Sequence, residues 1–200
     1  MNIANSSRYI CQVYISEKLK LRNIVSVKGE KFLITVQNVP IYNLQIIAKL
    51  LLKVGNELDR SYPDLYSDIP NQLGAGYYPN HELTRLAYLL FCEHLTKSGM
   101  NWVKMAAMLA MANGFVMDCI QRNEEEVIGT VIDSFSEFVS NNLTNWMHMQ
   151  NGWNVPEEFN SLKLYLSKRE IINDNSLKIC AIIFVVLILL YFWLHDNQYL

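Results

Sequence analysis

The sequence has few charged residues and little glycine, and its cysteines lie too far apart to form a metal-binding motif. Charged side chains make up 18% of the 200 residues and apolar side chains 51%, whereas about a quarter is charged in a typical globular protein. A disordered chain is not expected from this composition. The net charge of −2 provides no basic surface for nucleic acid. The cysteines at 11, 92, 119 and 180 have no short spacing to each other. We therefore expect buried, reduced thiols and no metal site.

Signatures of catalysis and of phosphate binding are missing as well. The eight glycines are scattered, so no glycine-rich loop is available to surround a phosphate. The histidines at 81, 94, 148 and 195 follow the order of no known nucleophile–base motif. The acidic residues at 124–126 are typical of a solvated helix start rather than of an acid–base pair. We expect neither an enzyme nor a cofactor-binding protein.

A long uncharged run stands near the C-terminus. Residues 179–194, ICAIIFVVLILLYFWL, would span roughly 24 Å as a helix, slightly less than a bilayer core of about 30 Å. Leu177 extends the run, and Lys178 can place its ammonium group among the headgroups. We predict a transmembrane anchor, with a buried core helix as the alternative. The predicted organisation is a helical domain over residues 1–169, a linker over 170–176, the anchor over 177–194 and a tail over 195–200.

Apolar residues at three- and four-residue spacing predict helices in most of the first domain. Gly55 interrupts one of them, where glycine costs about 1 kcal/mol relative to alanine, so we expect another surface to approach closely there. In the helix over 80–97 we expect Leu83, Leu86, Leu90 and Phe91 to face inward. Residues 24–36 alternate apolar and polar residues, as a small hairpin or a strand-like loop would. The expected helices cover residues 7–20 (N-cap Ser6 or Ser7), 43–60 (N-cap Asn43), 80–97, 101 to about 122, 124–141 and 157 to about 169.

The helix that starts near residue 101 is apolar on nearly every side. The thirteen residues between Lys104 and Asp118 carry no charge. Asn101 is a suitable N-cap for a helix that begins at Trp102. Such a helix lies either in a bilayer or among other helices, and its Asn113 favours the second. We predict an all-α domain packed around this central helix.

Four segments, in order, resemble the homology segments of the Bcl-2 family of apoptosis regulators. SGMNWVK at 98–104 is similar to the first, Gly-x-Asn-Trp-Gly-Arg, and WMHMQNGW at 146–153 to the second, which ends in Gly-Gly-Trp. LLKVGNE at 51–57 resembles the third, Leu-x-x-x-Gly-Asp-Glu, and SRYICQVYISEKL at 7–19 the N-terminal one. The resemblance covers nearly the whole chain. It implies a Bcl-2-like bundle of about eight helices around a central hydrophobic hairpin, plus a C-terminal transmembrane helix.

The resemblance also implies a surface groove that binds an amphipathic BH3 helix from a relative. For Leu86, Met108 and Leu109, a place in the ordinary core is an equal alternative. The implied groove residues are Leu58, Tyr62, Leu86, Leu90, Asn101, Trp102, Lys104, Met105, Met108 and Leu109. The chain's own BH3-like segment is implied at Leu51, Gly55, Asn56 and Glu57.

The chain departs from the family pattern at several of these positions. Lys104 replaces an arginine that pairs with an aspartate of the partner helix, and Val103 replaces the glycine before it. Lysine keeps the charge but lacks the bidentate fork, so we expect weaker and less selective pairing. Asn56 stands where the BH3 segment normally carries an aspartate. Methionines at 108 and 111 replace phenylalanines, which suggests a groove that accommodates varied partners.

The resemblance leaves two functional directions. A pro-survival guardian would hold BH3 helices of pro-death relatives in the groove, and this is the expected function because Asn56 and the N-terminal segment favour it. The alternative is a pro-apoptotic effector that unfolds its core, exposes residues 51–60 and permeabilises the mitochondrial outer membrane. A tail-anchored enzyme or adaptor that only shares the pattern is a third interpretation.

The same resemblance implies partners and a location. The expected partners are BH3-containing proteins and other family members, in heterodimers or homodimers, with no nucleic acid and no cofactor. The anchor would place the chain in the mitochondrial outer membrane or, alternatively, in the endoplasmic reticulum membrane. Most of the chain would then lie in the cytosol.

Overall fold

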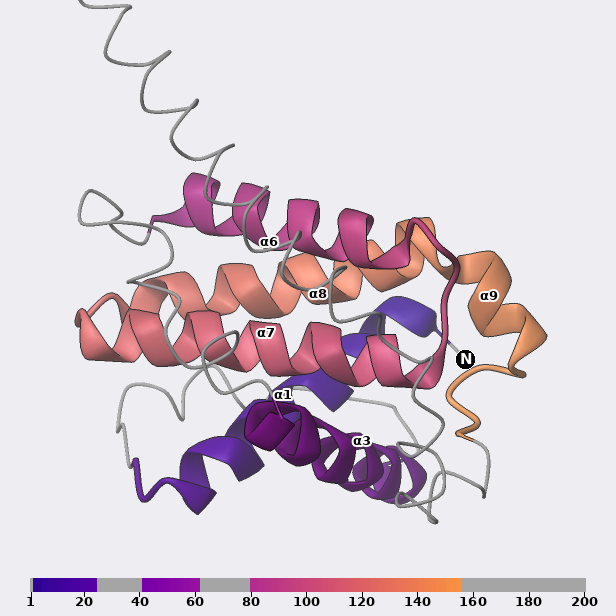
Figure 1. Cartoon of the computed structure of the whole chain (residues 1–200), viewed down its shortest axis with the longest axis horizontal. Helices are drawn as coiled ribbons and strands as arrows, with labels where there is room; N and C mark the ends of the chain where they lie inside the picture. Colours follow the sequence, from indigo (N-terminus) through magenta and orange to yellow (C-terminus); the bar gives the residue numbers. More distant parts are fainter. Residues whose placement is uncertain (1, 25–40, 62–79, 156–200) are drawn as a thin grey trace, which may run out of the picture.

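The computed structural model describes residues 2–24, 41–61 and 80–155, and every regular element in these ranges is a helix (Figure 1). This confirms the all-α class. The predicted hairpin at 24–36, the helix at 157–169 and the anchor at 177–194 fall outside the described residues, the hairpin almost entirely. The elements are α1 (Ile3–Leu21), α3 (Ile41–Ser61), α6 (His81–Thr96), α7 (Trp102–Gln121), the 3-10 helix η1 (Glu125–Val127), α8 (Ile128–Asn142) and α9 (Thr144–Met149).

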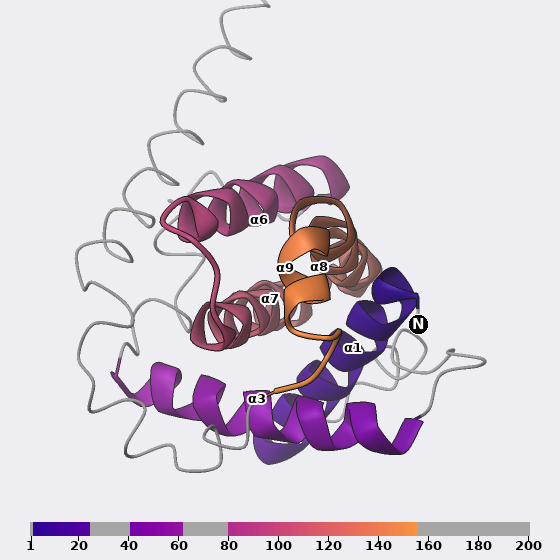
Figure 2. The same cartoon turned by 90° about the vertical axis from the view of Figure 1, so that its right-hand side faces the viewer.

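Helix α7 lies in the centre of the described bundle, as predicted. Every residue from 102 to 119 is buried, and α7 contacts α1, α3, α6 and α8. Figure 2 shows α7 nearly end on, between α6 on one side and α3 on the other. Among the described helices, α7 alone is long and apolar enough to cross a membrane, yet 89% of its apolar window is buried inside the protein. Its apolar surface therefore serves as the core of this fold.

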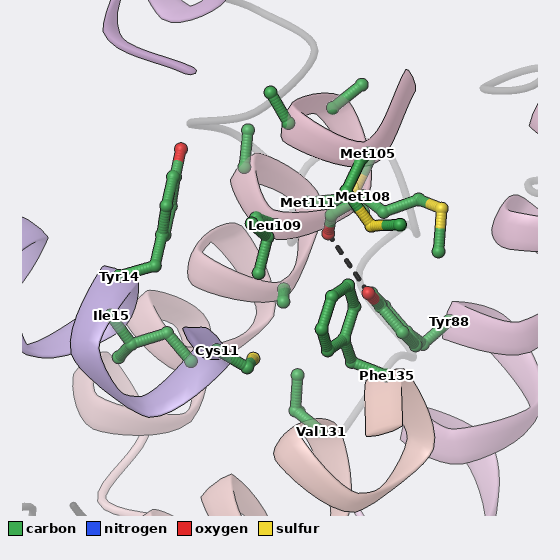
Figure 3. Close-up of a cluster of buried hydrophobic side chains, with 14 of the residues drawn as sticks. Cys11, Tyr14, Ile15, Tyr88, Met105, Met108, Leu109, Met111, Val131 and Phe135 are labelled. Atoms are coloured by element: carbon green, nitrogen blue, oxygen red, sulfur yellow. Dashed lines mark hydrogen bonds between the residues drawn. The ribbon is translucent and has the colours of Figure 1, made fainter. Parts of the chain in front are cut away.

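The core is built where α1, α6, α7 and α8 meet (Figure 3). Tyr88 of α6 and Phe135 of α8 point toward the methionines of α7 in that view. The Tyr88 hydroxyl donates to the Met108 carbonyl oxygen at 3.0 Å, so its buried polar atom is satisfied. The Tyr88 ring also meets the Phe115 ring edge to face, with centroids 6.1 Å apart. These contacts attach α6 firmly to the central helix.

Several predicted helix starts were wrong, for local reasons. Helix α1 begins at Ile3, and its N-cap is Asn2, whose side chain accepts from the Asn5 N–H at 3.2 Å. Ser6 and Ser7 lie inside the helix, where their hydroxyls donate to carbonyl oxygens four residues earlier. A serine with this option does not need to cap.

The starts of two further helices were also misplaced. Helix α3 begins at Ile41, so Asn43 is an exposed interior residue rather than the N-cap. The acidic residues before α8 precede or form the short η1 turn, and α8 itself begins at Ile128. The acidic residues therefore marked the connection before α8 rather than the first turn of α8 itself.

The predicted inner face of α6 was partly wrong. Leu83 and Phe91 are buried, but Leu86 is 43% exposed and Leu90 is only half-buried. The buried positions between and beyond them are Thr84, Ala87, Tyr88, Cys92 and Leu95, which recur at three- and four-residue steps. The predicted buried face followed the leucines and was therefore rotated about the axis of α6. Small side chains at a close helix contact belong to the core as much as leucines do.

Candidate functional site

The predicted groove residues fall into two groups in the structure. Leu58 of α3 is 3% exposed, and Met105, Met108 and Leu109 of α7 are completely buried. Figure 3 shows the three α7 residues directed into the core. On α6, Leu86 is exposed and Leu90 is half-buried, and Tyr62 is outside the described residues. Contact of any of them with a partner helix stays a prediction.

The start of α7 is built by Asn101 and Trp102, as the sequence predicted. The Asn101 side chain accepts from the Lys104 N–H at 2.9 Å and so satisfies one of the free donors at the helix start. The Trp102 ring is buried and lies 4.9 Å from the Trp146 ring and 5.9 Å from the Trp153 ring, between centroids. The tryptophan cluster joins residues 98–104 to residues 146–153, two segments that the sequence singled out separately.

Lys104 does not extend into solvent from this helix start. Its side chain is buried, and its Nζ donates to Ser98 Oγ at 2.8 Å and to the Gly99 carbonyl oxygen at 2.7 Å. Both acceptors belong to the turn between α6 and α7. In the family pattern, a positive charge at this position pairs with a partner helix. Here the Lys104 ammonium group is hydrogen-bonded within the chain instead.

The BH3-like segment lies on α3 with its apolar face enclosed. Leu51 is completely buried, Val54 is 1% exposed and Leu58 is 3% exposed, while Asn56 and Glu57 are half-buried. Helix α3 packs against α7 and α1, and Figure 2 shows it lying across one side of the bundle. The face that a BH3 helix presents to a groove thus faces the chain's own core.

Gly55 permits this packing, as predicted. A Cβ atom placed on Gly55 would lie 1.8 Å from the Tyr14 hydroxyl oxygen of α1, closer than any real contact. Tyr14 is itself completely buried. The glycine is therefore required for the close approach of α1 to the BH3-like segment.

An ion pair lies beside this contact and was missed by sequence reasoning. Lys18 Nζ bonds Asp59 Oδ2 at 2.5 Å, and Arg22 lies 4.0 Å from the same oxygen. The Lys18 ammonium also lies 5.9 Å from the centre of the Tyr14 ring. Burial lowers the pKa of Lys18, although its bond to Asp59 opposes this shift.

The spacing within each helix places both partners of this pair once the contact between Tyr14 and Gly55 is known. Lys18 follows Tyr14 by four residues, and Asp59 follows Gly55 by four residues. Residues four apart share one face of a helix, so each charged residue lies next to the close contact on its own helix. We call Tyr14, Lys18, Gly55 and Asp59 the α1–α3 latch.

The described cysteines are buried, unreactive thiols. Cys11, Cys92 and Cys119 are free and buried, and burial raises the pKa of Cys119 to about 12. Because the thiolate is the reactive form, these side chains stay protonated at neutral pH. Within the described ranges no cluster of three or more possible metal ligands occurs. The described site therefore consists of apolar packing, the α1–α3 latch and Lys104 bonded to its own turn.

Comparison with known proteins places these features in a family. Residues 51–153 match the family model described as apoptosis regulator proteins of the Bcl-2 family. The Bcl-2-related ovarian killer protein of Gallus gallus is 26% identical over 153 residues, which cover 76% of this chain and 68% of that protein. The Homo sapiens protein of the same name is 27% identical over 107 residues, 54% of this chain and half the length of the human protein.

Solved structures show the same fold. The crystal structure of chicken BOK matches with a TM-score of 0.63 and 25% identity, over 76% of this chain and 91% of that one. The solution structure of human BOK matches with a TM-score of 0.64 and 24% identity, over 76% and 94%. Trichoplax adhaerens trBcl-2L2, solved bound to trBak BH3, matches with a TM-score of 0.63 and 15% identity, over 77% and 95%.

Proposed function

The chain belongs to the Bcl-2 family of apoptosis regulators, and on this premise we propose that it is a pro-death effector that permeabilises the mitochondrial outer membrane. The direction is supported by the relatives, which bear the name of killer proteins in chicken, human and other vertebrates. The pro-survival function expected from the sequence is therefore replaced by its alternative. Asn56 and an ordered N-terminal segment, which favoured the guardian, are weak features beside whole-domain similarity.

The structural observation that carries the proposal is the enclosure of the BH3-like segment. Leu51, Val54 and Leu58 face the core, and Gly55 is closed off by Tyr14 of α1. A guardian needs a groove that stands open for a partner helix. An effector of the proposed kind needs, in addition, that its own BH3-like segment stay concealed until the helices separate. The α1–α3 latch supports the proposal, because it holds α1 against this segment.

Separation of α3 would expose apolar surface that cannot stay in water. Burial of each leucine or valine of α3 stabilises the fold by about 1.5–3 kcal/mol, and α7 beneath it is buried and mostly apolar. Once uncovered, these apolar faces can be removed from water either by packing against a second copy of the chain or by entering a bilayer. The proposed effector uses both, so that assembly and membrane entry follow from one opening step.

An amphipathic BH3 helix of a relative is the proposed trigger. Such a helix presents apolar residues at the same steps as α3 and can compete for the surface that α3 covers. The Trichoplax protein of this fold was solved with a BH3 helix bound. The proposed anchor over 177–194 holds the chain at the mitochondrial outer membrane, or at the endoplasmic reticulum, before the trigger arrives.

The proposal is tested by expressing the full chain in cells that lack endogenous effectors and then applying a death signal. We expect cytochrome c to leave the mitochondria, and a latch-closed control should reduce the release. A suitable control carries cysteines in place of one residue on α1 and one on α3, tested with and without reductant. A guardian would instead leave cytochrome c in place and protect normal cells from the same signal.

A further inference from the structure

The ammonium group of Lys104 lies against the turn that joins α6 to α7. Its two bonds there, to Ser98 Oγ and to the Gly99 carbonyl oxygen, measure 2.8 Å and 2.7 Å. Gly99 has φ +97°, a conformation that glycine adopts without strain. The Gly99 N–H in turn donates to the Thr96 carbonyl oxygen at 2.9 Å. The turn is thus a defined structure with two oxygens directed at one charge.

The backbone of Lys104 is held independently of its side chain. The Lys104 N–H donates to the Asn101 cap, so the side chain can change partners without unwinding α7. The first turn of α7 contains no acidic residue, and the positive end of the helix dipole disfavours an ammonium group there. Ser98 and Gly99 therefore provide the negative partial charge that stabilises this cation.

We propose that the turn formed by Ser98 and Gly99 competes with a carboxylate of a partner helix for the Lys104 ammonium group, so that Ser98 determines how strongly the chain selects an acidic partner. The inference rests on the proposed binding of amphipathic helices. Lysine has a single nitrogen with three donors, whereas arginine has five donors spread over a planar fork. Two of the three Lys104 donors already point at Ser98 and Gly99, so a carboxylate that engages two donors with its two oxygens displaces at least one bond of the turn.

This competition accounts for an otherwise isolated feature of the sequence. The chain's own BH3-like segment carries Asn56 at the position where the family pattern has an aspartate. Where the lysine is already stabilised by its own turn, a helix with an amide at this position loses little relative to one with a carboxylate. A weak preference of Lys104 for acidic helices is then consistent with the neutral Asn56 in the chain's own BH3-like segment.

The test measures binding of two synthetic peptides that cover residues 44–62, one natural and one with Asn56→Asp. Both are titrated into the full chain in detergent by fluorescence anisotropy, as wild type, Ser98→Ala and Ser140→Ala. Ser140 provides the matched control, because its hydroxyl donates to the Glu137 carbonyl oxygen of α8 instead. We expect Ser98→Ala to tighten binding of the acidic peptide by about three- to tenfold. The natural peptide should change less than about twofold, and Ser140→Ala should change neither.

A second measurement does not depend on a variant. The acidic peptide should speed hydrogen exchange of the Gly99 amide in the wild-type chain, because the turn loses the ammonium group that braces it. The natural peptide should leave that rate unchanged. A role of Ser98 in folding alone would not make the exchange rate depend on the charge of the peptide.

The outcomes separate the two ideas. If both peptides bind but Ser98→Ala leaves the affinity of the acidic one unchanged or weaker, the competition is wrong and the proposed function stands. If neither peptide binds the wild type or any variant, the proposed capture of helices is wrong, and the competition falls with it.

Discussion

The hydroxyl oxygen of Tyr14 in α1 fills the space that a side chain on Gly55 of α3 would occupy. The distance from that oxygen to a Cβ on Gly55 would be 1.8 Å, and the ring carbon Cζ would lie at 2.9 Å. Because Tyr14 is completely buried, a shift of its ring would have to displace neighbouring core side chains. The identity of residue 55 therefore sets the distance between α1 and the BH3-like segment.

Gly55→Ala is expected to loosen α1 from α3. Overpacking a core costs about 1–3 kcal/mol, and the gain from replacing glycine by alanine in a helix is at most about 1 kcal/mol. We expect the free energy of unfolding to fall by about 2 kcal/mol, measured by chemical denaturation. Lys53→Ala, on the exposed side of the same helix, should change it by less than about 0.5 kcal/mol.

The same position offers a rescue. Tyr14→Phe removes the oxygen atom that meets the new methyl group and should restore part of the stability lost in Gly55→Ala. If Gly55→Ala alone is as stable as the wild type, the close contact does not limit the approach of the two helices.

The ion pair of the latch should respond unequally to loss of each partner. The Lys18 side chain is 4% exposed and that of Asp59 is 23% exposed. Asp59→Ala leaves a buried ammonium group without its carboxylate, which typically costs about 3 kcal/mol. Lys18→Met removes the buried charge and leaves Asp59 near Arg22, so we expect it to cost less than half as much. Equal losses in a denaturation series would contradict this assignment.

The stability of the chain should depend on pH through Lys18. Burial lowers its pKa in the folded chain below the ordinary value of 10.5. Between the lowered pKa and 10.5 the unfolded chain binds more protons, so the contribution of Lys18 to stability rises with pH in that window. The difference in free energy of unfolding between wild type and Lys18→Met should therefore grow as pH rises through it. This difference cancels the titration of the buried tyrosines and cysteines, and a constant difference would refute the burial effect.

Membrane attachment should depend on the C-terminal run. A chain that ends at Asp174 is expected to leave the membrane fraction, because about twenty apolar residues are needed to hold a helix in a bilayer. Fractionation of cells that express each form measures this directly, with a charge-preserving substitution in the tail, His195→Gln, as the control. Persistent sedimentation of the truncated chain with organelles would contradict the anchor.

The main features of the described fold could be predicted from local patterns. The uncharged stretch between Lys104 and Asp118 indicated a central helix, and α7 is completely surrounded. Gly55 was predicted to mark a close approach because it interrupts a good amphipathic helix, and Tyr14 is the neighbour. Both inferences depend on one helix at a time, which residue spacing describes well.

Features that depend on two helices could not be predicted in the same way. The bond between Lys18 and Asp59 joins residues 41 apart in sequence, so it requires knowing that α1 and α3 lie side by side. The exposure of Leu86 depends on the rotation of α6 about its axis. The use of Lys104 by its own turn depends on the path of the chain at Ser98 and Gly99. Each is a matter of tertiary register, which the apolar pattern leaves open.

The most direct test of the proposed function uses liposomes of mitochondrial lipid composition that enclose a fluorescent dextran. Purified full chain is added alone and together with an amphipathic BH3 peptide, and release of the dextran is followed with time. The proposed effector releases the dextran in proportion to its concentration, faster with the peptide. Liposomes that stay sealed at every concentration, and that the chain protects against another pore-forming protein, would show a guardian instead.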